Sequence, residues 1–163
     1  PNTGPLIALA GIDHLDLLRE LFAAVIVPHA VHQEVLAGGS FAVGLPAYKR
    51  AHWLKVAEPV KADAMLLALL DEGEAAVISL ARARGIDRVL IDEQKARRIA
   101  RTVYNLNVKG SVWVLIHAKQ QGLLGSVGDA IQAMRDNGYW IHDHIMHHAL
   151  KAAGEAEQKK LWP

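Results

Sequence analysis

The chain has 163 residues, of which 52% are apolar and 21% are charged, and its formal net charge is +1. This length and composition predict one globular α/β domain over residues 1–163, and the small net charge by itself indicates neither a nucleic acid nor a membrane surface as partner. The absence of cysteine excludes a disulfide scaffold and a thiolate metal site.

The sequence shows no membrane-spanning or targeting segment. An α-helix needs roughly 20 consecutive apolar residues to span a bilayer, and no run approaches that length because Asp13 and His14 soon follow the apolar segment Leu6–Leu9. A charged region followed by an apolar core, which is typical of a signal peptide, is not visible either. Together with the lack of cysteine, this predicts a cytoplasmic protein without a membrane partner.

Short apolar runs alternate along the chain with segments of helical periodicity. Runs of β-branched residues predict buried strands, and apolar residues spaced by three or four predict helices that end near Gly or Pro. Most of residues 40–60 give no clear pattern. In chain order we expect strand Val25–Val27, a helix from Pro28 through Val35, strand Trp53–Val56, helices Ala62–Leu70 and Glu74–Arg84 separated by a break at Asp71–Gly73, strand Val89–Ile91, helix Glu93–Val103, strand Leu106–Val108, helices Val112–Gln121 and Val127–Asn137, and a last helix over about residues 142–154.

Alternating strands and helices are typical of a parallel sheet that is covered by helices on both faces. In such sheets ligands bind beyond the carboxyl ends of the strands. Asp92 and Glu93 directly follow the apolar run Val89–Ile91, so this rule directs attention to them first.

Polar or acidic residues stand beside a strand end or a helix start at four places, namely Asn2, Glu34, Glu74 and the pair Asp92-Glu93. Carboxylates that gather at one edge repel each other unless a cation neutralises them, and such oxygen ligands suit Mg²⁺ or Mn²⁺. Each residue also has a structural alternative. Glu74 could favour its helix dipole, Asp92 could cap the next helix, Glu34 could be a surface residue, and Asn2 could start a turn.

A basic segment follows Asp92. Eight basic and only three acidic residues lie between Arg82 and Lys109, and four of the basic ones are in the helix after Asp92: Lys95, Arg97, Arg98 and Arg101. Their position predicts contacts with the phosphates of RNA, because backbone charge dominates sequence-independent nucleic-acid binding. The alternative is a solvated helix face.

Five separate segments resemble the PIN-domain proteins, and in particular a prokaryotic PIN-like family related to VapC-type toxin ribonucleases. They are Asn2–Leu9 (NTGPLIAL), Ile26–Val35 (IVPHAVHQEV), Leu70–Val77 (LDEGEAAV), Leu90–Arg97 (LIDEQKAR) and Val108–Ser111 (VKGS), and the resemblance extends from about Asn2 to Trp140. It implies a three-layer α/β/α fold around a parallel sheet. It also implies a metal-dependent endoribonuclease that is the toxin of a toxin–antitoxin pair, with RNA as substrate and an antitoxin protein and further copies of the chain as partners.

The same resemblance assigns individual roles. Asn2, Glu34, Glu74 and Asp92 match the acidic quartet, with Mg²⁺ or Mn²⁺ held by Glu34, Glu74 and Asp92. Glu93 matches a neighbouring acidic position and Ser111 a small hydroxyl residue near the site. Because Asn2 should end the first strand, we expect that strand upstream of Pro1.

Two positions depart from the pattern of the family. Asn2 stands where the nucleases usually have Asp, and its amide can ligate a cation through oxygen but adds no negative charge. Trp113 stands where the related pattern usually has Gly. The main alternative to an active nuclease is therefore a catalytically degenerate PIN-like module that binds RNA or protein.

Two further interpretations have less support. The C-terminal helix carries His142, His144, His147 and His148, and His144 and His148 share a helix face as two metal ligands would, but the pattern lacks the Glu of a zinc protease. A phospho-acceptor domain with Asp92 as acceptor would need two adjacent acidic residues after its first strand, and Asn2-Thr3 does not provide them.

Overall fold

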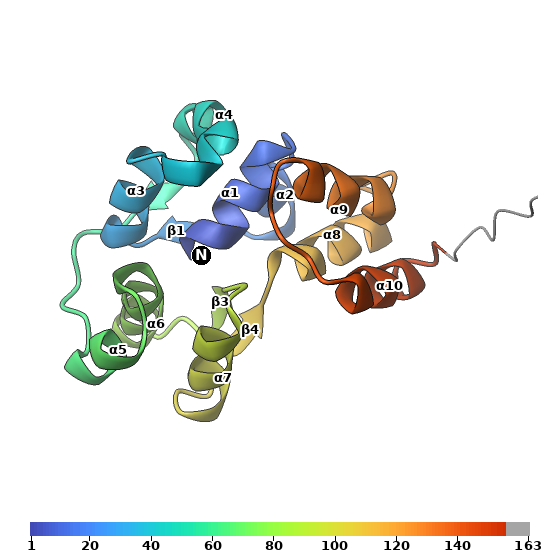
Figure 1. Cartoon of the computed structure of the whole chain (residues 1–163). Helices are drawn as coiled ribbons and strands as arrows, with labels where there is room; N and C mark the ends of the chain where they lie inside the picture. The colour runs from blue at the N-terminus through green and yellow to red at the C-terminus, as the bar shows by residue number, and fades with distance from the viewer. Residues whose placement is uncertain (156–163) are drawn as a thin grey trace, which may run out of the picture.

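In a computed structural model, which describes residues 1–155 apart from the side chains of Ser40 and Phe41, the apolar segment after Asn2 forms helix α1 (Thr3–Gly11). Residues Pro5 to Ala10 are all buried. A helix that is apolar around its whole circumference is typical of the centre of a domain. The elements packed around α1 are α3 (His29–Leu36), η1 (Gly39–Gly44), α4 (Leu45–Arg50), α8 (Ser111–Gln120) and α9 (Val127–Asp136), as Figure 1 shows.

The strands form two parallel pairs rather than one continuous hydrogen-bonded sheet. Strand β1 (Ile26–Val27) pairs with β2 (Lys55–Val56), and β3 (Arg88–Leu90) pairs with β4 (Asn107–Lys109), with Val89 opposite Val108. The strands are only two or three residues long. The free edge of β3 receives one backbone hydrogen bond from the start of the chain, where the Asn2 amide donates to the Leu90 carbonyl at 2.8 Å.

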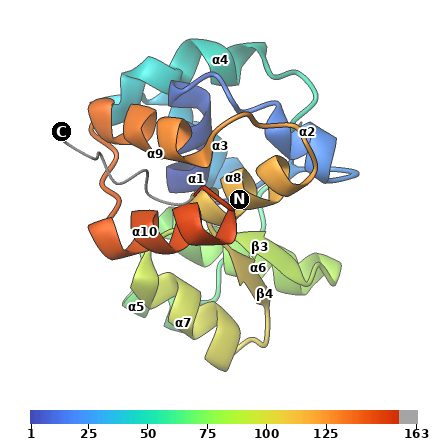
Figure 2. The same cartoon turned by 90° about the vertical axis from the view of Figure 1, so that its right-hand side faces the viewer.

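Helices cover the strands on both sides, which confirms the predicted mixed α/β fold. In both views α5 (Ala64–Leu69) and α7 (Gln94–Thr102) lie below β3 and β4, whereas α1, α4 and α9 lie above them (Figures 1 and 2). Helix α2 (Leu17–Leu21) packs on α8, and α10 (Asp143–Ala152) packs on α8 and α9. Within residues 1–155, none of the helices is both long enough and apolar enough to cross a bilayer.

Helix α6 (Glu72–Arg84) begins two residues earlier than predicted. Asp71 accepts a hydrogen bond from the Glu74 amide at 2.7 Å, and the Glu74 carboxylate accepts one from the Asp71 amide at 3.2 Å. This reciprocal capping box starts the helix at Glu72, so the break between α5 and α6 comprises Leu70 and Asp71 rather than the predicted Asp71–Gly73. The other predicted elements are present with ends within two residues, and η1 and α4 occupy the region without a clear pattern.

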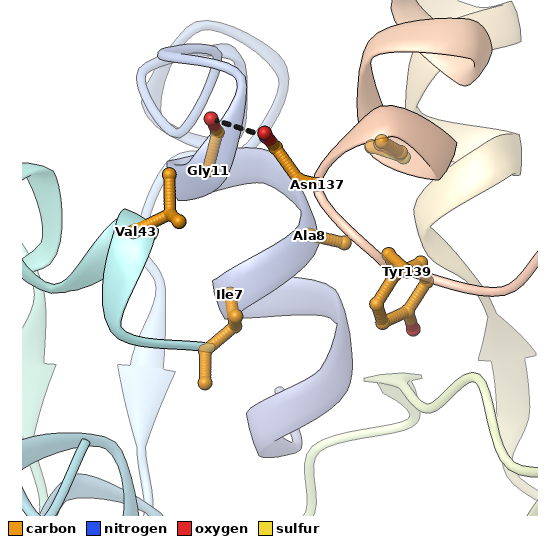
Figure 3. A pocket seen from close by; sticks show the side chains of 8 residues that line it. Ile7, Ala8, Gly11, Val43, Asn137 and Tyr139 are labelled. Carbon is orange, nitrogen blue, oxygen red and sulfur yellow. Dashed lines mark hydrogen bonds between the residues drawn. The ribbon is translucent and has the colours of Figure 1, made fainter. Parts of the chain in front are cut away.

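The two flanks of α1 are fixed by close contacts (Figure 3). On one flank, a Cβ at Gly44 would lie only 2.9 Å from the Ala10 Cβ, so η1 approaches α1 closely there. On the other, the Asn137 side chain donates to the Gly11 carbonyl at 2.8 Å, and Tyr139 lies alongside Ala8. The turn after α9 is therefore pinned to α1, which directs Tyr139 toward the N-terminal end of that helix.

Candidate active site at the start of helix α1

Asn2 and Glu34 face a common space beside Gly73. The Asn2 side chain is buried, and its Oδ1 atom has no hydrogen-bond partner among the described residues. Thr3 donates through its hydroxyl to Glu34 Oε2 at 2.6 Å, which holds this exposed carboxylate against the start of α1. A Cβ on Gly73 would lie 2.7 Å from Glu34 Oε2 and 3.1 Å from Asn2 Oδ1. Glycine therefore keeps open the point toward which both oxygens are directed.

Glu74 adds a second carboxylate to this side of the site. Burial, together with the negative charges of Asp71, Glu93 and Glu34, raises the pKa of Glu74 to about 7, against the lowering effect of the hydrogen bond from the Asp71 backbone amide. The surrounding protein thus supplies too little positive charge to stabilise the ionised carboxylate of Glu74. A cation bound among these oxygens would favour the charged carboxylate.

Asp92 follows β3 and lies on another side of the α1 start. The Ser111 amide donates to Asp92 Oδ1 at 2.7 Å, and the Tyr139 hydroxyl donates to Oδ2. Burial raises the pKa of Tyr139 above its ordinary range, and the charge of Asp92 raises it further, so the hydroxyl stays a donor. A Cβ on Gly110 would lie 2.6 Å from Asp92 Oδ1, so glycine is needed for this close approach.

An open groove of about 1200 Å³ extends from Asp92 along α7. Arg97 donates to the Ile91 carbonyl at 2.6 Å and Arg101 to the Val108 carbonyl at 3.1 Å, so both helix residues also brace the strands. Partial burial lowers the pKa of Arg97, and the charge of Arg101 lowers it further, while Asp92 acts in the opposite direction. The residues lining the groove include Asp92, Glu93, Lys95, Arg97, Arg98, Arg101, Ser111, Tyr139, Trp140, His142 and His144.

The predicted residues therefore form two adjoining groups rather than one. Asn2, Glu34 and Glu74 lie on one side of the α1 start, and Asp92 lies on the groove side with Ser111. In the part of the chain that the structure describes, no three His, Cys, Asp or Glu side chains form a group that could hold a metal ion. The expected three-carboxylate set is thus not assembled, and neither is a site within the histidine cluster.

Two of the structural alternatives, and the departure at Trp113, now have an answer. Glu93, and not Asp92, caps α7, since its carboxylate accepts from the Ala96 amide at 2.7 Å. Glu74 takes part in the capping box as well as lying in the acidic group. Trp113 stacks on His117 with ring centroids 4.7 Å apart and does not line the groove.

The first group fits a hard divalent cation. Mg²⁺ is usually bound through one or two carboxylates together with water, and an amide oxygen is a further suitable ligand. Glu34 and Glu74 supply two carboxylates, and Asn2 Oδ1 is a buried oxygen that lacks a partner among residues 1–155. The open space at Gly73 is where such an ion could be reached by these oxygens.

Sequence reasoning missed Asp71, Gly73 and Tyr139. The Asp71–Glu74 spacing is the recognisable signal of a capping box, and it could have placed Gly73 and Glu74 in the first turn of one helix. Tyr139 lies in a connection 47 positions after Asp92, and no pattern in the sequence links the two residues.

Asp92 follows strand β3 and lines a groove that also carries the basic side chains of α7, within a mixed α/β fold. A family model described as DUF3368, PIN domain, matches residues 1–155, and the chain belongs to this PIN-domain family. PIN domains generally use divalent metal ions and typically bind RNA. Comparisons with curated proteins and with solved structures found no match.

The raised pKa of Glu74 predicts a pH-dependent effect of the Glu74→Gln substitution. The unfolded chain ionises near the ordinary value of 4.5 and the folded protein near 7, so wild-type stability should fall as the pH rises between these values. Gln mimics the protonated carboxyl and can keep the capping box. In thermal unfolding with EDTA, the variant should match wild type near pH 4 and exceed it increasingly up to about pH 7.

The matched control is Glu72→Gln, which removes an exposed carboxyl from the same helical turn. If both variants gave the same stability difference at every pH, the burial and crowding of Glu74 would not be the cause.

Proposed function

We propose that this protein is a Mg²⁺- or Mn²⁺-dependent endoribonuclease, and that it is the toxin component of a toxin–antitoxin pair. The observation that carries the nuclease proposal is the buried Asn2 Oδ1 atom beside Glu34 and Glu74, which has no hydrogen-bond partner among residues 1–155, together with a groove lined by four basic residues. The toxin role, the antitoxin partner, the homo-oligomer and the cytoplasmic location rest on the family resemblance and the sequence, and they stay predictions.

Glu34 and Glu74 would hold the cation, with Asn2 as a neutral ligand. Bound there, the ion supplies a Lewis acid that lowers the pKa of a water molecule and neutralises charge on a phosphodiester. Thr3 fixes the Glu34 carboxylate, and the capping box fixes the start of α6 and hence Glu74. The protein thus positions these oxygens before the substrate arrives.

Asp92 would complete the site from the groove. Each of its oxygens already accepts one hydrogen bond, and each has a second lone pair for a metal or a water molecule. Lys95 and Arg98 expose their charges along α7, and Arg97 and Arg101 keep further donors beyond their bonds to backbone carbonyls. These four side chains would contact the phosphates of RNA and orient the strand toward Asp92.

Asp92→Asn tests the proposed activity. The wild type should cleave a labelled single-stranded RNA in Mn²⁺, and the variant should be slower by roughly 10²- to 10⁴-fold, because the amide cannot accept a proton from the attacking water and lacks the negative charge that would help to hold a cation. Gel analysis of cleavage products measures the rate. Asp87→Asn, an exposed acid at the other end of the same strand, is the control that should keep wild-type activity. Equal rates for wild type and Asp92→Asn would contradict the proposal.

Gly73→Ala separates the cation site from stability. The new methyl group would meet the flexible Glu34 carboxylate and displace it, while Ala in the first turn of α6 is not expected to destabilise the helix. The variant should unfold at or above the wild-type temperature and yet lose Mn²⁺-dependent cleavage. Full activity in a well-folded Gly73→Ala protein would exclude this location for the metal.

A catalytically degenerate RNA- or protein-binding module is the second candidate. Two observations favour it: Asn2 contributes no charge, and Glu34, Glu74 and Asp92 are not assembled as one ligand group in residues 1–155. Asn2→Asp discriminates between the two functions by calorimetric titration with Mn²⁺ and by the cleavage assay. An active native enzyme should bind Mn²⁺ and cleave before the substitution is made, whereas a degenerate protein should gain both properties only in Asn2→Asp.

A further inference from the structure

Trp140 is a large apolar residue held out into solvent. The residue is 78% exposed, although both of its neighbours are anchored. Tyr139 donates to Asp92, whereas Ile141 is buried and its carbonyl accepts a hydrogen bond from Arg135 at 2.6 Å. The exposure of Trp140 therefore belongs to a fixed piece of backbone, and this places the indole in the lining of the groove.

The wall around Trp140 is aromatic. His142 stands edge-on to the indole with centroids 5.7 Å apart, and His144 stacks on His142 at 5.4 Å. The same groove is lined along α7 by Lys95, Arg97, Arg98 and Arg101. Both views place α7 below α10, the helix that His142 precedes (Figures 1 and 2). The groove thus combines flat rings near α10 with positive charge on α7.

We propose that Trp140 is the stacking platform for one unpaired nucleobase of a single-stranded RNA whose phosphates lie along α7. This subsite rests on the proposed ribonuclease function and adds to it a binding position for one unpaired base. Aromatic side chains beside a positively charged groove are the combination by which proteins bind single strands without reading their sequence. The groove volume of about 1200 Å³ exceeds that of ordinary small-molecule pockets, which suits a polymer segment.

A double helix does not satisfy this arrangement. Its bases are stacked on one another inside the duplex, so none presents a free face to the Trp140 indole, and proteins recognise duplex RNA mainly by shape and backbone. An acidic peptide would match the charge of α7 but would leave the indole without a ring to stack on. The exposed aromatic group therefore favours an unpaired base over both.

The subsite also bears on where cleavage occurs. Trp140 directly follows Tyr139, whose hydroxyl donates to Asp92. A base stacked on the indole would therefore be held at a fixed position relative to the Asp92 carboxylate, because the neighbouring residue Tyr139 is hydrogen-bonded to it. Stacking would fix the distance between the bound nucleotide and the reacting phosphodiester, which makes Trp140 a positioning residue.

Binding without cleavage tests the subsite. Fluorescence anisotropy with EDTA measures Kd for a labelled 12-nucleotide RNA, for the same RNA annealed to its complement, and for a matched strand with abasic sites. The wild type should prefer the unpaired strand. Trp140→Ala should weaken its binding roughly 5- to 100-fold, as loss of one stacked base does, whereas binding of the abasic strand should be unchanged. Trp140→Phe should restore most of the affinity, and Val43→Ala, another exposed apolar residue outside the groove, should have no effect.

Salt dependence separates stacking from charge. Trp140→Ala should lower the affinity at every salt concentration without changing the slope of log Kd against log salt, whereas Arg98→Ala should reduce that slope by about 1.

The subsite is overturned if Trp140→Ala binds the unpaired strand as tightly as wild type, if the duplex binds better, or if polyglutamate competes as well as RNA does. When the first result accompanies Mn²⁺-dependent cleavage, the ribonuclease proposal stands and only the subsite fails. When RNA is neither bound nor cleaved, both fail.

Discussion

The structure depends on the burial of residues Pro5 to Ala10 of helix α1. Its apolar side chains organise the surrounding helices, and its N-terminal turn then opens toward the strands. The first amides of any helix lack intrahelical acceptors and carry partial positive charge, which favours carboxylates nearby. Glu34, held through Thr3, lies at this helix end, and Asp92 lies beside Gly4. The core of the fold and the polar site are therefore two ends of one helix.

The same burial that stabilises α1 leaves polar groups at the site in an unfavourable environment. The Oδ1 atom of Asn2 loses access to water without gaining a hydrogen-bond partner among the described residues, which is unfavourable. Glu74 resists ionisation because it is buried near other carboxylates. These costs are balanced by packing elsewhere, as is common where groups are held ready for a ligand. The same position of Gly73 that leaves space for an ion also gives up the small helix-stabilising effect of a methyl group.

Local sequence patterns predicted most of the helices and strands, but they contain no information on contacts between residues that are far apart in the chain. Val89–Ile91 and its following helix were recognisable because apolar runs and helical spacing are local signals. Helix α1 was not assigned, because a helix that is apolar on every face has no periodicity to detect. The strand-end rule led to Asp92, but its partner Tyr139 comes from a connection between two helices. The separation of Asp92 from Glu34 and Glu74 depends on side-chain directions that no residue pattern contains.

The two hydrogen bonds that Asp92 accepts, from Ser111 and Tyr139, have a consequence for folding during synthesis. Its two donors follow it by 19 and 47 positions, so neither exists when Asp92 leaves the peptidyl-transferase centre. At about 5–20 residues per second, the ribosome adds Tyr139 roughly 2–10 s after Asp92. During that interval the carboxylate lacks its hydroxyl donor. A nascent chain therefore acquires its assembled groove late, only after α9 has been made and the connection behind it has folded back on α1.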